Sequence, residues 1–173
     1  MSHISSLNSH LKFHIQNIFL MNDFQQIKLQ LYNKCVDYTE QRLNNIQSAI
    51  DAANESGNDE TKSSAGDKHE TGRAMMQLEQ EKNAKQLVET LELKKLLDRI
   101  NPNQNSQTTA LGSLVITNKE KFYISISAGK IVIDSEIYFA VSPTSPIAIR
   151  LIGLKANQEM NFNGSVYSIK QIL

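Results

Sequence analysis

Two long amphipathic stretches, separated by a short segment rich in acids, constrain the fold of this chain most strongly. The first begins at residue 27, and no proline interrupts it. Its apolar residues recur at intervals close to one helical turn. They are Leu31, Cys35, Tyr38, Leu43, Ile46, Ile50 and Ala53. The pattern predicts one long helix that ends near Asn54-Glu55-Ser56-Gly57-Asn58, where glycine and asparagine favour a helix cap.

The second stretch begins after Gly66 and ends at Asn101-Pro102-Asn103, a strong helix stop. Its apolar positions are Met75, Met76, Leu78, Ala84, Leu87, Val88, Leu91, Leu97 and Ile100. Each helix would be about 45 Å long, with too few large apolar residues to form a compact bundle alone. We therefore expect the helices to pair as an antiparallel coiled-coil hairpin over residues 27–103, with Met75 and Met76 packed inside it and residues 58–73 at its tip.

The remainder of the chain, residues 104–173, is rich in β-branched and aromatic residues. Residues 104–109 are polar and are expected to form a linker. Ser145-Pro146 predicts an N-cap and first position of a short helix through Leu151. Asn163-Gly164 is a strong hairpin signal. The expected strands lie around residues 114–116, 122–126, 131–133, 137–140, 160–162 and 166–169. The fold class is thus α+β, with a small antiparallel sheet domain after the hairpin.

Residues 1–26 form an N-terminal extension in this division of the chain. Residues 1–20 contain no acid and three histidines, His3, His10 and His14, and their first half fits no periodic pattern. Two alternatives remain open: the extension adds a short helix, or translation begins at Met21.

Charge and cysteine content indicate the kind of partner and compartment. Lys and Arg number 18, and Asp and Glu also number 18. The chain therefore lacks a basic excess that would favour nucleic-acid backbone, and a protein partner is expected in place of sequence-specific DNA binding. The single cysteine, Cys35, cannot form an internal disulfide, and we expect it to be buried in the helix seam. With no membrane-spanning apolar run and no signal-peptide pattern, we expect a cytoplasmic protein.

The expected hairpin tip carries the most distinctive chemistry. Asp67 and Glu70 are three residues apart, so in one helical turn they share a face and can converge on a cation. Carboxylate oxygens suit Mg²⁺, but two carboxylates do not hold this ion firmly without further ligands, such as a partner's acids. Asp59 and Glu60 add an upstream acidic pair. The simpler alternative is that these acids only complement a helix dipole in a solvated turn.

Two motifs resemble the Gre family of bacterial transcript-cleavage factors, GreA and GreB. Gly66-Asp67-Lys68-His69-Glu70 is similar to the family's Gly-Asp-x-x-Glu-Asn element. The second motif resembles the family's Ser-Pro-(Ile/Leu), Leu-x-Gly and Tyr-x-Ile signature. It comprises Ser145-Pro146-Ile147, Leu151, Gly153, Gly164, Tyr167 and Ile169. The resemblance implies a coiled-coil hairpin followed by an FKBP-like domain. One departure is Thr71-Gly72-Arg73, which stands where the family usually has Asn-Ala-Glu.

The resemblance further implies that the hairpin enters the secondary channel of RNA polymerase. There, Asp67 and Glu70 would help to hold a Mg²⁺ ion of the polymerase active site, which would cut backtracked RNA by a two-metal route. The chain itself would not be an enzyme. Asp59, Glu60, His69 and Arg73 are candidate contacts to the polymerase or RNA; for His69 and Arg73 the simpler alternatives are solvent exposure and a pair with Gln77 or Glu70.

Three other functions remain open. A hairpin that binds the channel without stimulating cleavage would inhibit or regulate the polymerase. The sheet domain alone could be a prolyl isomerase, but such pockets are lined by aromatic residues and this chain has no tryptophan. A coiled-coil adaptor would tolerate neutralisation of the tip.

Overall fold

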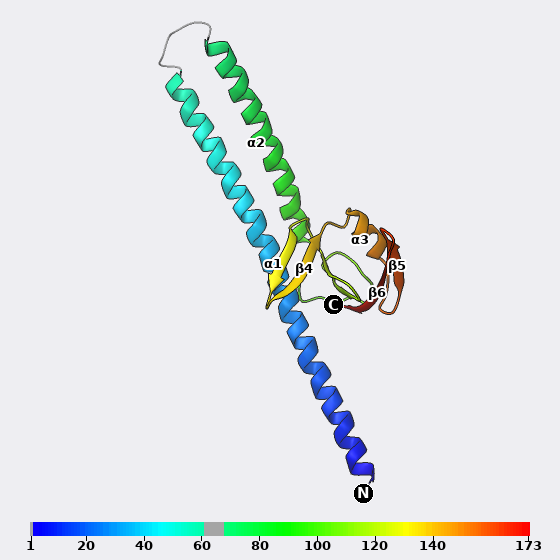
Figure 1. Cartoon of the computed structure of the whole chain (residues 1–173). Coiled ribbons are helices and arrows are strands. Elements are labelled where there is room, and N and C mark those ends of the chain that lie inside the picture. Colours follow the sequence, from blue (N-terminus) through cyan, green and yellow to red (C-terminus); the bar gives the residue numbers. More distant parts are fainter. Residues whose placement is uncertain (1, 61–67) are drawn as a thin grey trace. The chain divides into compact units, whose positions relative to one another are not determined.

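The computed structural model of the 173-residue chain contains two long helices followed by a six-stranded sheet (Figure 1). It describes the backbone of residues 2–60 and 68–173, and the side chains of residues 23–55 and 72–173. The chain divides into two compact units. Met1–Cys35 and Ile100–Leu173 form the first unit, and Val36–Arg99 form the second. The first long helix contributes to both units.

Helix α1 spans Ser2–Glu60, and helix α2 spans Lys68–Asp98. The prediction of two long helices is confirmed, but α1 is longer at both ends than predicted. The first residues belong to α1, which extends past Gly57 as well as starting before residue 27. A lone glycine costs a helix only about 1 kcal/mol, so it does not force an end. In the described part of the chain, no helix is both long and apolar enough to cross a membrane.

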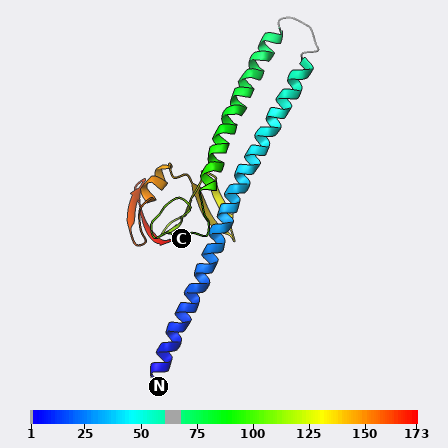
Figure 2. The same cartoon turned by 180° about the vertical axis from the view of Figure 1, so that it is seen from behind.

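In the second unit, α1 and α2 lie side by side and run in opposite directions (Figures 1 and 2). Arg42 of α1 contacts Glu89 of α2, with 3.7 Å between guanidinium and carboxylate. Farther along α1, Ile50 and Ala53 share a recess with Asn83 of α2. Partner numbers thus fall along α2 as they rise along α1, which is the antiparallel order.

The buried stripe between these helices is narrower and more polar than the apolar pattern predicts. Buried residues recur every seven positions, as expected where two helices meet along one seam. They are Thr39 and Ile46 in α1, and Asn83, Thr90 and Leu97 in α2. Met75 is 68% exposed, so the prediction that it packs inside the hairpin is wrong. A two-helix pair buries only one stripe of each helix, and Met75, Leu78 and Val88 lie outside it.

The sheet of the first unit has the strand order β3-β4-β2-β1-β6-β5. Its elements are β1 (Leu114–Thr117), β2 (Lys121–Ile124), β3 (Gly129–Ile133), β4 (Glu136–Val141), α3 (Pro146–Leu151), β5 (Glu159–Phe162) and β6 (Ser165–Ile172). The prediction of an antiparallel sheet is wrong in one place, because β2 and β4 pair in parallel. β3 lies at one edge of the sheet. β4 lies between β3 and β2, antiparallel to β3 and parallel to β2.

One face of the sheet packs beneath α3. The core consists of Val115, Phe122, Ile124, Ala148, Leu151, Met160 and Ile169. The predicted cap of α3 is confirmed, since the Ser145 hydroxyl accepts a hydrogen bond from the Ala148 amide at 3.3 Å. The predicted β5–β6 hairpin is confirmed as well. Asn163 and Gly164 have φ values of 49° and 74°, the left-handed pair that a tight two-residue turn requires.

Residues of α1 pack against the other face. Tyr123 alternates with the core residues Phe122 and Ile124, and therefore points to this second face. Cys35 is buried, as predicted, but its Sγ lies 3.5 Å from Ser125 Oγ. Burial raises the pKa of the Tyr123 phenol, and the nearby Cys35 and Tyr32 raise it further. Cys35 thus packs against the sheet domain. It also belongs to the apolar stripe of the first helix, from which its burial was predicted.

The chain after α2 is also fastened to α1. The Gln25 side chain donates to the Pro102 carbonyl at 2.7 Å, and Lys28 Nζ donates to the Gln104 carbonyl at 2.5 Å. The predicted linker is thus anchored at its start. At its end, the Thr109 amide donates to the Leu154 carbonyl at 2.8 Å.

Among these contacts, the one made by Lys28 has the largest free-energy cost, because it buries a charged group. Only 1% of the residue is exposed, and burial lowers the pKa of its ammonium group to about 8. A charged group moved out of water without a counter-charge destabilises the fold, and one carbonyl acceptor offsets this cost only in part.

We predict that Lys28→Met stabilises the protein at pH 7 by about 1–3 kcal/mol, because the desolvation cost disappears. The unfolded lysine binds its proton up to a pH of about 10.5, whereas the folded one releases it near pH 8. The unfolded state therefore binds more protons between these values, and wild-type stability rises with pH from 8 to 10. Urea unfolding at several pH values should show this rise in the wild type and its loss in the variant.

Lys34→Met is the matched control, because Lys34 is exposed on the same helix. Equal effects of the two substitutions at every pH would contradict the assigned cost of Lys28. Measurements should stay below pH 10, where Tyr123 begins to act in the opposite direction.

A second prediction concerns Asn83, which is 3% exposed and whose Nδ2 has no hydrogen-bond partner among the residues that the structure describes. An unpaired buried amide costs about 1–3 kcal/mol. Asn83→Leu removes that cost beside Ile50 and Leu87, which line the same recess. We expect the thermal unfolding temperature of the full-length protein to rise. Asn44→Leu, at an exposed position of α1, controls for helix propensity; an equal rise in both variants would contradict the prediction.

Candidate functional site

The predicted tip lies at the connection between α1 and α2. Asp67 lies outside the described residues. Glu70 and His69 belong to the first turn of α2, and Asp59 and Glu60 to the last turn of α1. The side chains of these four residues also lie outside the described part. The convergence of Asp67 and Glu70 on one cation therefore stays a prediction, whereas the expected start of the second helix just after Gly66 is confirmed by α2.

Arg73 is the one predicted tip contact whose side chain is described, and it is exposed on α2. Gln77, one of its two predicted helical partners, donates its amide to Glu81 at 3.1 Å. Within the residues that the structure describes, no group of three or more His, Cys, Asp and Glu side chains is arranged to hold a metal.

A separate groove lies on the second unit. It has a volume of about 450 Å³. Its lining residues are Tyr38, Gln41, Arg42, Asn45, Ile46 and Ala49 of α1, and Gln86 of α2. The α1 residues are spaced by three or four positions from one pair to the next, so they lie along one side of the helix.

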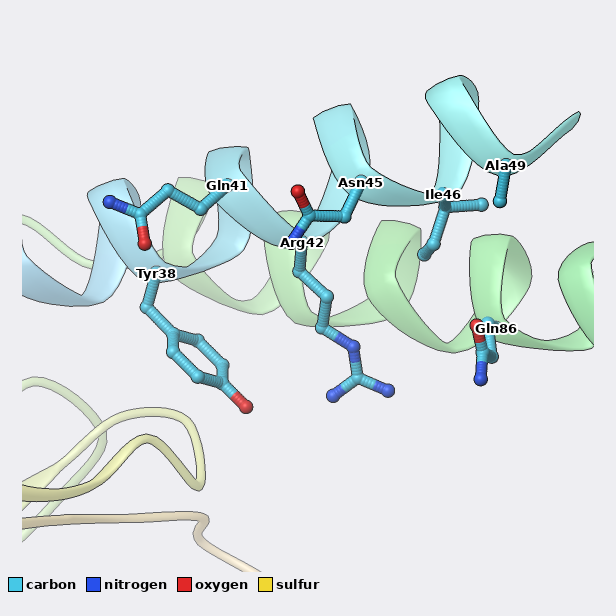
Figure 3. Close-up of a pocket in the computed structure, with 7 residues that line it drawn as sticks. All are labelled: Tyr38, Gln41, Arg42, Asn45, Ile46, Ala49 and Gln86. Carbon is cyan, nitrogen blue, oxygen red and sulfur yellow. The ribbon is translucent and has the colours of Figure 1, made fainter. Parts of the chain in front are cut away.

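Figure 3 shows how the groove's polar groups are placed. The Tyr38 ring and the Arg42 side chain extend in the same direction from successive turns of α1, and Gln86 enters from α2. Ile46, which is 4% exposed, and Ala49 supply the apolar part of the lining. The groove thus combines one cation, a phenol and three carboxamides with a small apolar surface.

The ion pair between Arg42 and Glu89 is weak. The Arg42 guanidinium lies 3.7 Å from the Glu89 carboxylate, and both side chains are substantially exposed, at 37% and 52%. Exposed ion pairs contribute about 0–1 kcal/mol, because water and salt screen them. Arg42 can therefore turn to another anion at little cost.

The groove was not predicted from the sequence. Tyr38 was assigned to the apolar stripe of the first helix, and no role was assigned to Gln41, Arg42 and Asn45. The available signal is the recurrence of hydrogen-bonding side chains at positions 38, 41, 42 and 45, directly beside the buried stripe.

Comparison of the chain with protein-family models and with curated protein sequences finds no match. The resemblance to the Gre family accordingly rests on the two motifs and on their order along the chain.

Proposed function

We propose that this protein is a Gre-type factor that binds RNA polymerase and stimulates its Mg²⁺-dependent cleavage of backtracked RNA. The observation that carries the proposal is the order of the elements: two long antiparallel helices, the acidic motif at their connection, and then the sheet unit that contains the second motif. A short motif alone occurs by chance in many chains. Two motifs in this order, each on the element that the family would require, are far more restrictive.

Several residues of the second motif have specific structural roles in the sheet unit. Ser145 caps α3, and Leu151 and Ile169 are fully buried in the core. Gly153 and Gly164 have positive φ values of 85° and 74°, which glycine adopts without strain. These roles support the proposal that the six-stranded unit is an FKBP-like domain.

The first motif spans the end of the connection and the first turn of α2. Glu70 belongs to that turn, where the amide groups of the helix favour a negative charge. Oxygen donors on Asp67 and Glu70 fit Mg²⁺ chemically, and the remaining ligands would come from the polymerase. The metal would supply charge stabilisation for RNA hydrolysis, while these two residues would bind and orient it.

The length of the helices suits delivery of this motif to a distant site. The 31 residues of α2 correspond to about 46 Å at the standard rise per residue. A helix pair of this length can pass through a deep channel. Because the formal charges of the chain cancel, the acids of the connection form a local negative region that a metal centre would attract.

The test is an RNA-cleavage assay on stalled, backtracked elongation complexes with a labelled RNA. We predict that the wild-type protein shortens the RNA, and that Asp67→Ala with Glu70→Ala reduces the rate by at least about tenfold, because metal ligands are removed. Glu79→Gln with Glu81→Gln is the matched control, since it neutralises two exposed acids of α2 that lie outside both motifs and the predicted contacts, and it should leave the rate unchanged.

Binding to the polymerase should be measured in parallel, by competition with the labelled wild-type protein. Loss of cleavage with retained binding would agree with metal ligation in trans. Wild-type protein that binds but never shortens the RNA would contradict the cleavage function. It would support the second candidate, a channel-binding regulator, which the exposed Arg73 at a position usually acidic in the family favours.

A further inference from the structure

We propose that the groove on α1 beside Tyr38 and Arg42 is a binding site for a small planar anion, namely a flat ring that carries a carboxylate or a phosphate. This proposal does not depend on the proposed function, because the groove and the tip motif share no residue.

The anionic group is indicated by the donors that the groove presents. Arg42 is the one charged residue among those that line it, and its guanidinium offers several N–H groups in a planar fork that matches two oxygens at once. Gln41, Asn45 and Gln86 add carboxamide donors. An oxyanion placed beside Arg42 would receive charge-assisted hydrogen bonds from its guanidinium.

The planar ring is indicated by the rest of the groove. The Tyr38 ring lies one helical turn from Arg42 and extends beside it (Figure 3). Ile46 and Ala49 continue an apolar surface along the same side of α1. Aromatic rings prefer offset or edge-on contact with other rings, so a flat ring suits the Tyr38 end of the groove. A volume of about 450 Å³ is sufficient for one ring and its charged substituent.

Glu89 provides a specific check on this geometry. Its carboxylate already lies 3.7 Å from the Arg42 guanidinium, which is beyond an ordinary hydrogen bond. A ligand carboxylate would take the place of Glu89 and would also be repelled by it. Neutralising Glu89 should therefore strengthen anion binding, whereas neutralising Arg42 should weaken it.

The experiment is an NMR titration of the full-length protein with benzoate and with benzamide, which has nearly the same shape without the charge. We expect benzoate to bind at least about fivefold more tightly than benzamide and to shift the side-chain signals of Arg42 and Asn45. Arg42→Gln should remove this preference, and Glu89→Gln should increase it. Arg99→Gln, which neutralises an exposed arginine of the same unit, should leave it unchanged.

Two further probes identify the anion and the role of the ring. Phenyl phosphate in place of benzoate shows which oxyanion binds more tightly, and either order supports the site. Inorganic phosphate, which lacks a ring, should bind at least about fivefold more weakly than phenyl phosphate. Equal affinities for benzoate and benzamide, or an Arg42→Gln protein that binds benzoate like the wild type, would overturn the proposal.

Discussion

The structure depends on α1 being one uninterrupted helix that buries the same periodic stripe against two different partners. In the first unit, Lys28, Leu31 and Cys35 are buried where the chain after α2 and the sheet meet the helix. In the second unit, Thr39 and Ile46 continue the stripe opposite α2. Within each unit these buried residues recur at intervals of three, four or seven positions, which is the period of a helix with one buried stripe. The spacing of the buried residues does not change near residue 36, where α1 passes from the first unit to the second. The sequence therefore predicts a long amphipathic helix but does not show that its packing partner changes.

The elements that sequence predicted best are those specified by local chemistry. Ser145 and Pro146 start α3 because a hydroxyl cap and a fixed φ act within one turn. Asn163-Gly164 sets the β5–β6 register for the same reason. The parallel β2–β4 pair is different, since alternation along a strand does not say which strand lies beside it. The β3–β4 turn at Asp134-Ser135 has two positive φ values without a glycine, and therefore lacked the strongest turn signal.

Buried polar groups distinguish this chain from an idealised helix pair. Lys28 and Asn83 both occupy positions of the buried stripe, where a leucine would be more stabilising. A polar residue in such a stripe can fix the register of two helices, because a shifted pairing would bury it in a worse environment. Asn83 does not meet this condition, because its Nδ2 already lacks a hydrogen-bond partner among the described residues. Lys28 has a different role, because its hydrogen bond, together with that of Gln25, fixes the backbone of residues 102–104 after α2.

The two functional hypotheses differ in how much the sequence could contribute. The tip hypothesis comes from the resemblance of two sequence motifs to the Gre family, which can be read without any knowledge of the fold. The groove could not be found in this way, because it requires Gln86 from α2 beside residues 38–49 of α1. Its chemistry follows from an exposed arginine whose ion pair is weak. The groove proposal thus assigns to the second unit a recognition role that is separate from the residues at its end.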